Sequence, residues 1–468
     1  MEPIDSLKKI VSPENITTEQ FDRIAYSCEH GAVMGPFLPD KSIVSIAIVR
    51  PNSAEQVSDI LKLANEKLFP VLVRTKGTGM RVGIRPTKPG MVIMDLSRIG
   101  GIELFEDNGY VEVGPAVTTT QLNETLAPKY YFPMFPGSYR ISSIAGIIST
   151  NTSGHIVDSY QGKPGRYVMG LEVVLPTGEI IYTGTRTLRG HAGVDLTRLF
   201  IGGTGLFGVI TKIRLRLLRK PLEEAYSWII FESVKDIVKA SIRVLREGVY
   251  PRIFELMSEN ITESLFKIIG EEAPPGAVLI IITDGYTPGE ADWKMDKIVE
   301  ICKRDKVLAV RRFDEYSDWV PLWYAREYGG PIAPIEAVKA KLWDADVLDF
   351  QLVNAESLTK EAISLLETYR SQYGVDAWII GHIGGAMVHP VYSFPVDMDL
   401  KEVEKLKEKI RDDMTQLRLK YGGSMGEQGL FPNYVDWFRA AYGDDYYDAI
   451  KRIKKALDPN DILMPGRL

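Results

Sequence analysis

Two histidines and a glutamate in the last quarter of the chain have the residue types and spacing of a metal site. His382 and His389 lie seven residues apart in GHIGGAMVHP, and Glu427 follows in GEQG. The chain has only five histidines, so a pair at this spacing is informative. Imidazole and carboxylate groups can together hold one divalent cation and leave a position open for a substrate. These three residues are therefore candidate metal ligands and candidate catalytic residues.

The segment that carries the two histidines has the pattern of a β-hairpin. Apolar and β-branched stretches lie on both sides of the small residues at 384–386. A two-residue type II′ turn centred on Gly385 and Ala386 would set His382 directly opposite His389, with Cβ atoms about 5 Å apart. The alternative is that the two imidazoles only form hydrogen bonds within a half-buried sheet. The spacing alone leaves both interpretations open.

Length and composition exclude several classes of protein. A chain of 468 residues exceeds one hydrophobic core, so we expect two domains. The net charge of −6 and the lack of a basic stripe argue against a nucleic-acid partner. Cys28 and Cys302 are too few for a disulfide framework or an iron–sulfur cluster. No signal peptide or membrane span is visible, which predicts a cytoplasmic protein that reaches a membrane only peripherally, through a partner.

The order of predicted elements divides the chain into four parts. Residues 1–35 have the pattern of a helical arm, and strands alternate with short helices over 36–221. Longer amphipathic helices separate strands over 222–425, an order typical of an antiparallel sheet with helices on one face. Residues 426–468 form a final segment. The predicted fold class is therefore α+β.

Local patterns predict individual elements in the first half. Residues 42–49 are expected to form a strand, and residues 209–217 alternate apolar and basic side chains as a half-buried strand does. Ser53 and Gln56 have capping-box spacing, so a helix is expected to begin there.

Glycine-rich loops in the first half predict a phosphate-bearing cofactor. The segment 202–208 contains G-x-G-x-x-G but leads into a strand, and proline residues follow the similar segment 77–83, so neither opens a dinucleotide-binding helix. Small-residue loops nevertheless follow strands at 74–79, 135–146, 151–155 and 200–208. Backbone N–H groups of such loops can bind anions. The alternative is a set of ordinary tight turns.

Several motifs in one order give the chain a family resemblance. They are RTKGTG at 74–79, IAGIISTNTSG at 144–154, YVMGLEVVLPTGE at 167–179, DLTRLFIGGTGLFGVIT at 195–211 and the ending LDPNDILMPGRL. With them the chain resembles the FAD-linked oxidases of the glycolate oxidase, D-lactate dehydrogenase and D-2-hydroxyglutarate dehydrogenase group, in the vanillyl-alcohol oxidase superfamily. The resemblance implies a PCMH-type FAD-binding domain of two subdomains over 36–221, an α+β cap over 222–425, and a final segment that returns to the FAD domain.

The same resemblance implies which residues bind FAD. Residues 74–80 contain neither histidine nor cysteine, so FAD is expected to be bound non-covalently. The backbone of 75–79 would hold the pyrophosphate. The full expected set is Arg74, Thr75, Lys76, Gly77, Thr78, Gly79, Met80, Pro136, Gly137, Ser143, Gly146, Ser149, Asn151, Gly154, Gly205, Val209 and Ile210.

The activity implied by the resemblance is oxidation of a CH–OH group. A hydride would pass from a small hydroxylated substrate, a D-lactate- or glycolate-like 2-hydroxy acid, to flavin N5. A divalent metal such as zinc or manganese at His382, His389 and Glu427 would bind the substrate hydroxyl. Arg326, in the segment WYAR, would hold the carboxylate in a bidentate contact. The alternative for Arg326 is an ordinary surface or interface salt bridge.

The chain departs from the family where the chemistry takes place. Gly385-Ala386-Met387 replaces the usual Asp-Gly-Asn, and Gln428 replaces a histidine that would be the general base. A metal-bound alkoxide, Glu427, Tyr324 or Tyr328 would then have to take over that role. Two alternatives stay open: the same fold acting on another alcohol or a sugar acid, or a non-catalytic flavoprotein subunit for electron transfer or scaffolding.

The partners are less defined than the cofactor. The electron acceptor is unidentified, with a quinone, an electron-transfer flavoprotein, an iron–sulfur subunit and O₂ as candidates. The chain is expected to be a homodimer or a subunit of a complex.

Overall fold

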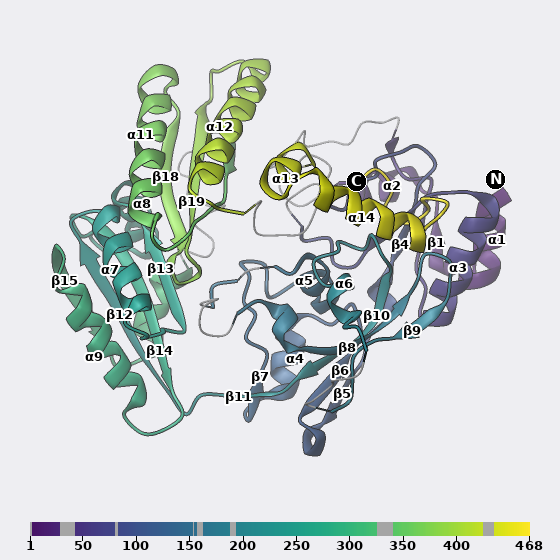
Figure 1. Cartoon of the computed structure of the whole chain (residues 1–468), viewed down its shortest axis with the longest axis horizontal. Helices are drawn as coiled ribbons and strands as arrows, with labels where there is room; N and C mark the ends of the chain where they lie inside the picture. The colour runs from purple at the N-terminus through teal and green to yellow at the C-terminus, as the bar shows by residue number, and fades with distance from the viewer. Residues whose placement is uncertain are drawn as a thin grey trace. The chain divides into compact units, whose positions relative to one another are not determined.

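The computed structural model groups the chain into two compact units (Figure 1). The residues described are 2–28, 43–79, 83–152, 154–156, 162–187, 193–324, 340–424 and 435–468. The first unit contains residues 1–153, 163–220 and 427–468, and the second contains 154–162 and 221–426. The sequence placed 154–162 with the expected FAD domain. The structure instead groups this segment with the second unit, where Ile156 forms a β-bridge with Ile253.

The first unit contains two main sheets and a small ribbon, in the orders β1-β2-β4-β3, β5-β6-β10-β8-β9 and β11-β7. The strands are β1 Ile16–Thr17, β2 Ala47–Val49, β3 Val71–Arg74, β4 Val92–Asp95, β5 Ile102–Phe105, β6 Tyr110–Val113, β7 Tyr130–Tyr131, β8 Val168–Val174, β9 Ile180–Tyr182, β10 Val209–Arg216 and β11 Leu218–Arg219. The α-helices are α1 Glu2–Val11, α2 Gln20–Tyr26, α3 Ala54–Lys67, α4 Thr119–Leu126, α5 Ile144–Thr150, α6 Thr197–Phe200, α13 Val435–Tyr442 and α14 Asp444–Leu457. Short 3-10 helices are η1 Pro13–Asn15, η3 Leu96–Arg98, η4 Glu106–Asn108 and η5 Pro164–Tyr167.

The local patterns of the first unit mostly form the elements expected of them. Ser53 caps α3, and its side chain accepts a hydrogen bond from the backbone N–H of Gln56. In β10 the apolar side chains are buried while Lys212 and Arg216 are exposed, as the alternation predicts. The expected strand at 42–49 was too long, because β2 begins only at Ala47.

The end of the chain packs onto the first unit. Leu463 forms a parallel bridge with Val71, and the backbone N–H of Met464 donates to the carbonyl of Val71 at 2.8 Å. Lys454 in α14 donates to the carbonyls of Leu206 and Leu463. These contacts bury Leu463 and Met464 in the core of the unit.

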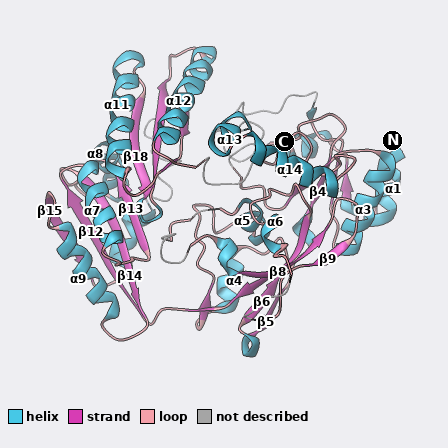
Figure 2. Cartoon of the chain, viewed as in Figure 1, coloured by secondary structure: helices cyan, strands magenta, loops and turns pink. Residues whose placement is uncertain are grey.

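The second unit contains an antiparallel sheet of eight strands among the described residues, in the order β15-β12-β14-β13-β18-β19-β16, with β17 paired to β19. Figure 2 shows strands of this sheet in magenta with helices beside them in cyan. The strands are β12 Glu223–Phe231, β13 Ile253–Met257, β14 Ala277–Gly285, β15 Val307–Phe313, β16 Ala340–Ala345, β17 Leu348–Asp349, β18 Asp376–His382 and β19 Met387–Pro395. The helices are α7 Val234–Arg246, α8 Glu259–Ile269, α9 Glu290–Cys302, α11 Ala355–Tyr373, α12 Leu400–Lys420 and the 3-10 helix η6 Ile383–Gly385.

The two faces of this sheet carry different cores. Helices α7, α9, α11 and α12 pack on one face (Figure 1). The prediction of helices on one face only is wrong, because the other face is covered as well. Helix α8 and the helical segment 316–324 pack on the other face around Trp228 and Trp319. Within the described ranges, no helix is both long and apolar enough to cross a membrane.

Candidate active site

The histidine hairpin forms, but with a longer turn than expected. Ile380, not His382, lies opposite His389 in the β18–β19 register. The connection is the 3-10 turn η6 followed by Ala386 at φ 55°, so the predicted two-residue type II′ turn is wrong. A turn of this kind ending in a left-handed residue is a common way to close a longer hairpin loop.

The two histidines nevertheless share one face of the sheet. Side chains alternate along a strand, so Ile380 and His382 point the same way, and His389 is a diagonal neighbour of His382. Their ring centroids are 5.2 Å apart with the rings nearly perpendicular. His389 Nδ1 lies 3.2 Å from the backbone carbonyl of Asp346.

A buried glutamate lies directly opposite His382 on the neighbouring strand. Glu255 in β13 is paired with His382, and Glu255 Oε1 is 2.5 Å from His382 Nδ1. Glu255 has no exposed surface, while the His382 side chain is 13% exposed. A buried carboxylate is costly unless a charged or strongly polar partner compensates it. This hydrogen bond therefore both stabilises Glu255 and fixes the orientation of the imidazole.

A third histidine lies against the same pair. His155 Nδ1 is 3.7 Å from Glu255 Oε2, and the His155 and His382 ring centroids are 5.1 Å apart. Trp323 contacts the His155 ring edge-on at 4.6 Å between centroids. These side chains all belong to the second unit and lie on the sheet face opposite α7, α9, α11 and α12. They are His155, Glu255, Trp323 and His382.

Sequence reasoning missed Glu255 and His155. Glu255 interrupts the apolar stretch of β13, and a charged residue in a buried strand is a recognisable signal for a paired carboxylate. His155 lies in a segment that the sequence treated only as a small-residue loop. Two expected site residues, Arg326 and Glu427, fall outside the described residues.

The first unit brings hydroxyl side chains from two expected FAD loops together. Thr75 Oγ1 lies 2.5 Å from Ser143 Oγ, and Thr78 Oγ1 lies 3.0 Å from Ser142 Oγ. Ser143 also caps α5 by accepting a hydrogen bond from the Gly146 N–H at 3.2 Å. Hydroxyl and backbone N–H groups are suitable partners for a pyrophosphate. The residues present therefore fit an FAD phosphate site.

Two glycines in these loops adopt backbone conformations that L side chains rarely take. Gly77 has φ +68°, and a Cβ there would lie 2.1 Å from the Arg74 guanidinium. Arg74 is itself held by the carbonyls of Tyr26 and Cys28. Gly205 has φ +80° and lies against Met464. The positive φ therefore favours glycine at Gly77, and a larger residue there would also displace the Arg74 guanidinium.

The other expected cofactor residues occupy varied positions. Asn151 ends α5 in a left-handed conformation, and Ser149 accepts a backbone hydrogen bond from Thr204 at its carbonyl. Val209 and Ile210 lie in β10 with side chains only 1% and 6% exposed. The first unit also contains Lys76, Gly79, Pro136 and Gly137, whereas Gly154 belongs to the second unit and Met80 lies outside the described residues.

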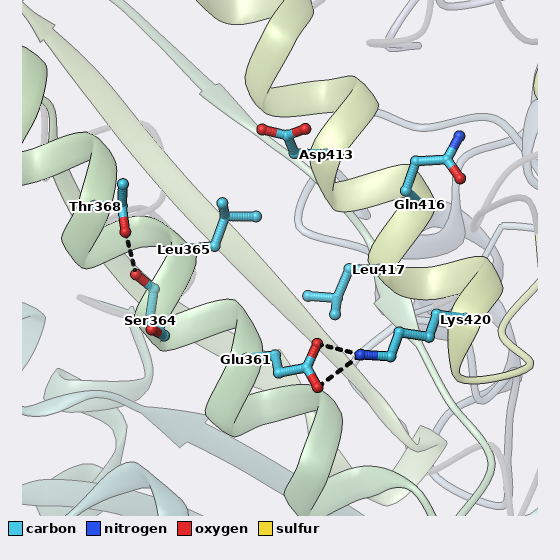
Figure 3. A pocket seen from close by; sticks show the side chains of 8 residues that line it. All are labelled: Glu361, Ser364, Leu365, Thr368, Asp413, Gln416, Leu417 and Lys420. Carbon is cyan, nitrogen blue, oxygen red and sulfur yellow. Dashed lines mark hydrogen bonds and ion pairs between the residues drawn. The ribbon is translucent and has the colours of Figure 1, made fainter.

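A groove on the helix side of the second unit is lined by no histidine, unlike the cluster around Glu255. It lies between α11 and α12 and is lined by Leu365, Leu417 and polar side chains (Figure 3). Lys420 pairs with Glu361 at 2.8 Å across it. We interpret it as a solvated surface between two helices.

Comparison with known proteins supports the cofactor and the class of chemistry. Residues 45–184 match the family "FAD binding domain", and residues 220–468 match "FAD linked oxidases, C-terminal domain". The chain is 27% identical over 470 residues to glycolate oxidase subunit GlcD of Bacillus subtilis, covering 99% of this chain and 96% of the relative. It is 30% identical over 478 residues to the mitochondrial D-lactate dehydrogenase [cytochrome] of Arabidopsis thaliana, and the match covers 100% of this chain and 80% of that relative.

Solved structures show the same fold at lower identity. A substrate-bound p-cresol methylhydroxylase aligns with a TM-score of 0.79 and 20% identity, covering 100% of this chain and 96% of that one. An alkyldihydroxyacetonephosphate synthase aligns with a TM-score of 0.78 and 18% identity, and the match covers 100% of this chain and 86% of that one.

The chain belongs to the FAD-linked oxidase family. Its fold is α+β, with an FAD-binding domain matched over residues 45–184 and, in the second unit, an antiparallel sheet covered by helices. FAD is its cofactor, and it is an oxidoreductase. The resemblance inferred from the sequence motifs is confirmed.

Proposed function

We propose that this protein oxidises a small 2-hydroxy acid, of the D-lactate or glycolate type, and passes a hydride to FAD. The named activities of the two sequence relatives support this substrate class. The first unit would hold FAD non-covalently through the loops around Thr75 and Ser143. The second unit would supply the polar side chains that bind the substrate.

The observation that carries the proposal is the buried Glu255–His382 pair with His389 beside it on one sheet face. Oxidation of an alcohol removes a proton from the hydroxyl and a hydride from the carbon. FAD, when bound, supplies the hydride acceptor at its N5 atom. Glu255 holds the His382 ring through Nδ1, which leaves His382 Nε2 to accept the hydroxyl proton, and the Glu255 carboxylate compensates the charge of the resulting imidazolium. His389, beside His382 on the same face, would help to bind the hydroxyl.

Two further residues complete the proposed substrate site. Arg326 would bind the substrate carboxylate with its planar guanidinium. Glu427, in the segment GEQG, would contribute a carboxylate to the reaction. Both assignments follow from the family resemblance, since these residues lie outside the described ranges.

Anaerobic mixing of the FAD-loaded protein with D-lactate, glycolate and D-2-hydroxyglutarate tests the proposal. At least one of them is expected to bleach the oxidised-flavin absorbance, and L-lactate serves as the stereochemical control. A flavin that dithionite reduces but none of the hydroxy acids reduces would contradict the proposal. That result would favour a different alcohol substrate or a non-catalytic subunit, and a screen of sugar acids and phenolic alcohols separates those two.

A further inference from the structure

His155, Glu255 and His382 form a cluster of potential metal ligands that the sequence did not suggest. One nitrogen or oxygen atom from each side chain lies within 4.8 Å of the other two. His155 is 4% exposed and Glu255 is fully buried. Buried charged and imidazole groups in mutual contact are unusual in a structural sheet unless they serve a specific purpose.

Three separate parts of the second unit position the cluster. Glu255 is in the middle of β13, and His382 ends β18 in the directly paired position. His155 is fixed beside them because the next residue, Ile156, bridges to Ile253 in β13. The site therefore depends on sheet pairing rather than on one mobile loop.

We propose that His155, Glu255 and His382 bind one divalent cation, with zinc as the best fit to two nitrogens and one oxygen. Donor atoms on one tetrahedral zinc ion lie about 3.3 Å apart, given zinc–ligand distances of about 2.0–2.1 Å. In the structure Glu255 Oε1 lies 2.5 Å from His382 Nδ1, and Glu255 Oε2 lies 3.7 Å from His155 Nδ1. The carboxylate therefore faces both imidazoles, and the hydrogen-bonded Glu255–His382 pair would have to separate by several tenths of an ångström to bind one ion. The cation would replace the proton that now joins Glu255 to His382.

The charge of the site is consistent with a cation and a carboxylate substrate. Two neutral imidazoles and the Glu255 carboxylate leave one positive charge on a bound divalent ion. A substrate carboxylate or alkoxide would compensate that charge, and the ion would lower the pKa of the substrate hydroxyl. The Trp323 ring against His155 limits access of water to that side and strengthens the electrostatic contacts. This inference rests on the proposed function for its substrate, but metal binding itself does not.

This ligand set differs from the one expected from the family. The expected ligands are His382, His389 and Glu427, so only His382 is common to both sets. His389 Nδ1 faces the Asp346 carbonyl, and within the described part of the chain His389 does not join the cluster of ligand atoms. Substitution of His155 or of His389 therefore distinguishes the two sites.

The test is titration of metal-stripped, FAD-loaded protein with Zn²⁺ against a chromophoric chelator, and with Co²⁺ followed by its visible absorption. The parent is expected to bind one ion. His155→Gln is expected to lower the Zn²⁺ affinity by more than the roughly 10–100-fold that is typical when a metal ligand loses a supporting hydrogen bond. His389→Gln is expected to have the smaller effect. Thr283 lies on β14, the strand next to β13, and its hydroxyl donates a buried hydrogen bond to the carbonyl of Ala291 in α9. Thr283→Val removes that bond, is the matched control, and should bind Zn²⁺ as the parent does.

FAD content and thermal unfolding are measured for every variant, so a loss of metal can be separated from a loss of fold. Parental Zn²⁺ affinity in a folded His155→Gln protein would overturn the proposal, as would a parent that binds no Zn²⁺ or Co²⁺. A larger loss in His389→Gln than in His155→Gln would place the metal at the family's expected site and also overturn it. Metal binding without flavin reduction by hydroxy acids would contradict only the proposed function.

Discussion

Glu255 and His382 lie directly opposite each other on adjacent strands, and a 2.5 Å contact joins Glu255 Oε1 to His382 Nδ1. The pair faces away from the four helices that cover the other side of the sheet. A strand residue that points into this face would ordinarily be apolar, like its neighbours Ile253 and Met257. Burial of the Glu255 carboxylate therefore costs free energy, and its partner is His382, which the sequence predicted to be a site residue.

The first prediction concerns this pair. Glu255→Gln keeps the shape of the side chain but removes the charge that orients His382. We expect kcat for the active hydroxy acid to fall by roughly 10–100-fold, with FAD content unchanged. Steady-state kinetics and the pH dependence of kcat measure the effect, with Thr283→Val as the structural control. Unchanged kcat and pH profile would show that Glu255 has no role in turnover.

The second prediction separates cofactor binding from helix capping. Ser143 caps α5 and contacts Thr75, whereas Ser233 caps α7 in the second unit in the same way. Each change to alanine is expected to lower stability by about 1 kcal/mol through loss of the cap. Only Ser143→Ala should also weaken FAD binding, by roughly tenfold for one lost hydrogen bond. FAD affinity is measured by flavin fluorescence. Equal affinity in the two variants would contradict the prediction that Ser143 contacts FAD.

The third prediction concerns a buried ionic cluster between β16 and α12. Asp344 is fully buried and lies 2.9 Å from Arg411 and 3.2 Å from Lys407. Burial lowers the pKa of Lys407, and Asp344 opposes this effect. Asp344→Ala removes the buried carboxylate that both cations contact and should cost about 3–5 kcal/mol in the free energy of unfolding.

Urea denaturation measures this loss. Glu300→Ala, which breaks an exposed ion pair with Lys297, is the control and should leave stability unchanged within error. A small effect at Asp344, comparable with that at Glu300, would contradict the interpretation of the buried cluster.

The fourth prediction concerns the two thiols. Burial, with a smaller contribution from Asp305, raises the pKa of Cys302 from 9.0 to about 12. A thiol reagent at mildly alkaline pH should therefore label the half-buried Cys28 in the native protein and label Cys302 only after unfolding. Mass spectrometry of the labelled peptides provides the measurement. Rapid native labelling of Cys302 would contradict its burial.

The same shift predicts a dependence of stability on pH. The folded protein keeps the Cys302 proton at pH values where the unfolded chain has lost it. The stabilisation is complete below pH 9.0 and is lost as the pH rises toward about 12. Cys302→Ala should reduce the fall in the free energy of unfolding over this pH range. If the free energy falls as steeply in the variant as in the parent, groups other than Cys302 cause the loss of stability at alkaline pH.

The sequence alone determined those features that depend on local pattern. The capping spacing at Ser53 predicted α3, the alternation at 209–217 predicted β10, and the small-residue loops with their flanking motifs predicted the FAD-linked oxidase family. Each of these signals lies within a few consecutive residues, where backbone sterics and side-chain periodicity act directly.

Only the tertiary structure decided which side chains meet. Glu255 is 127 residues from His382 in the chain, and no local pattern indicates that β13 pairs with β18. The hairpin register also differed from the expected one, because turn length sets register and the turn contains more residues than the glycines suggested. His155 reached the same cluster through the Ile156–Ile253 bridge. The histidine pair was readable from the sequence, but the residues that hold it depend on long-range strand pairing, which only the folded chain fixes.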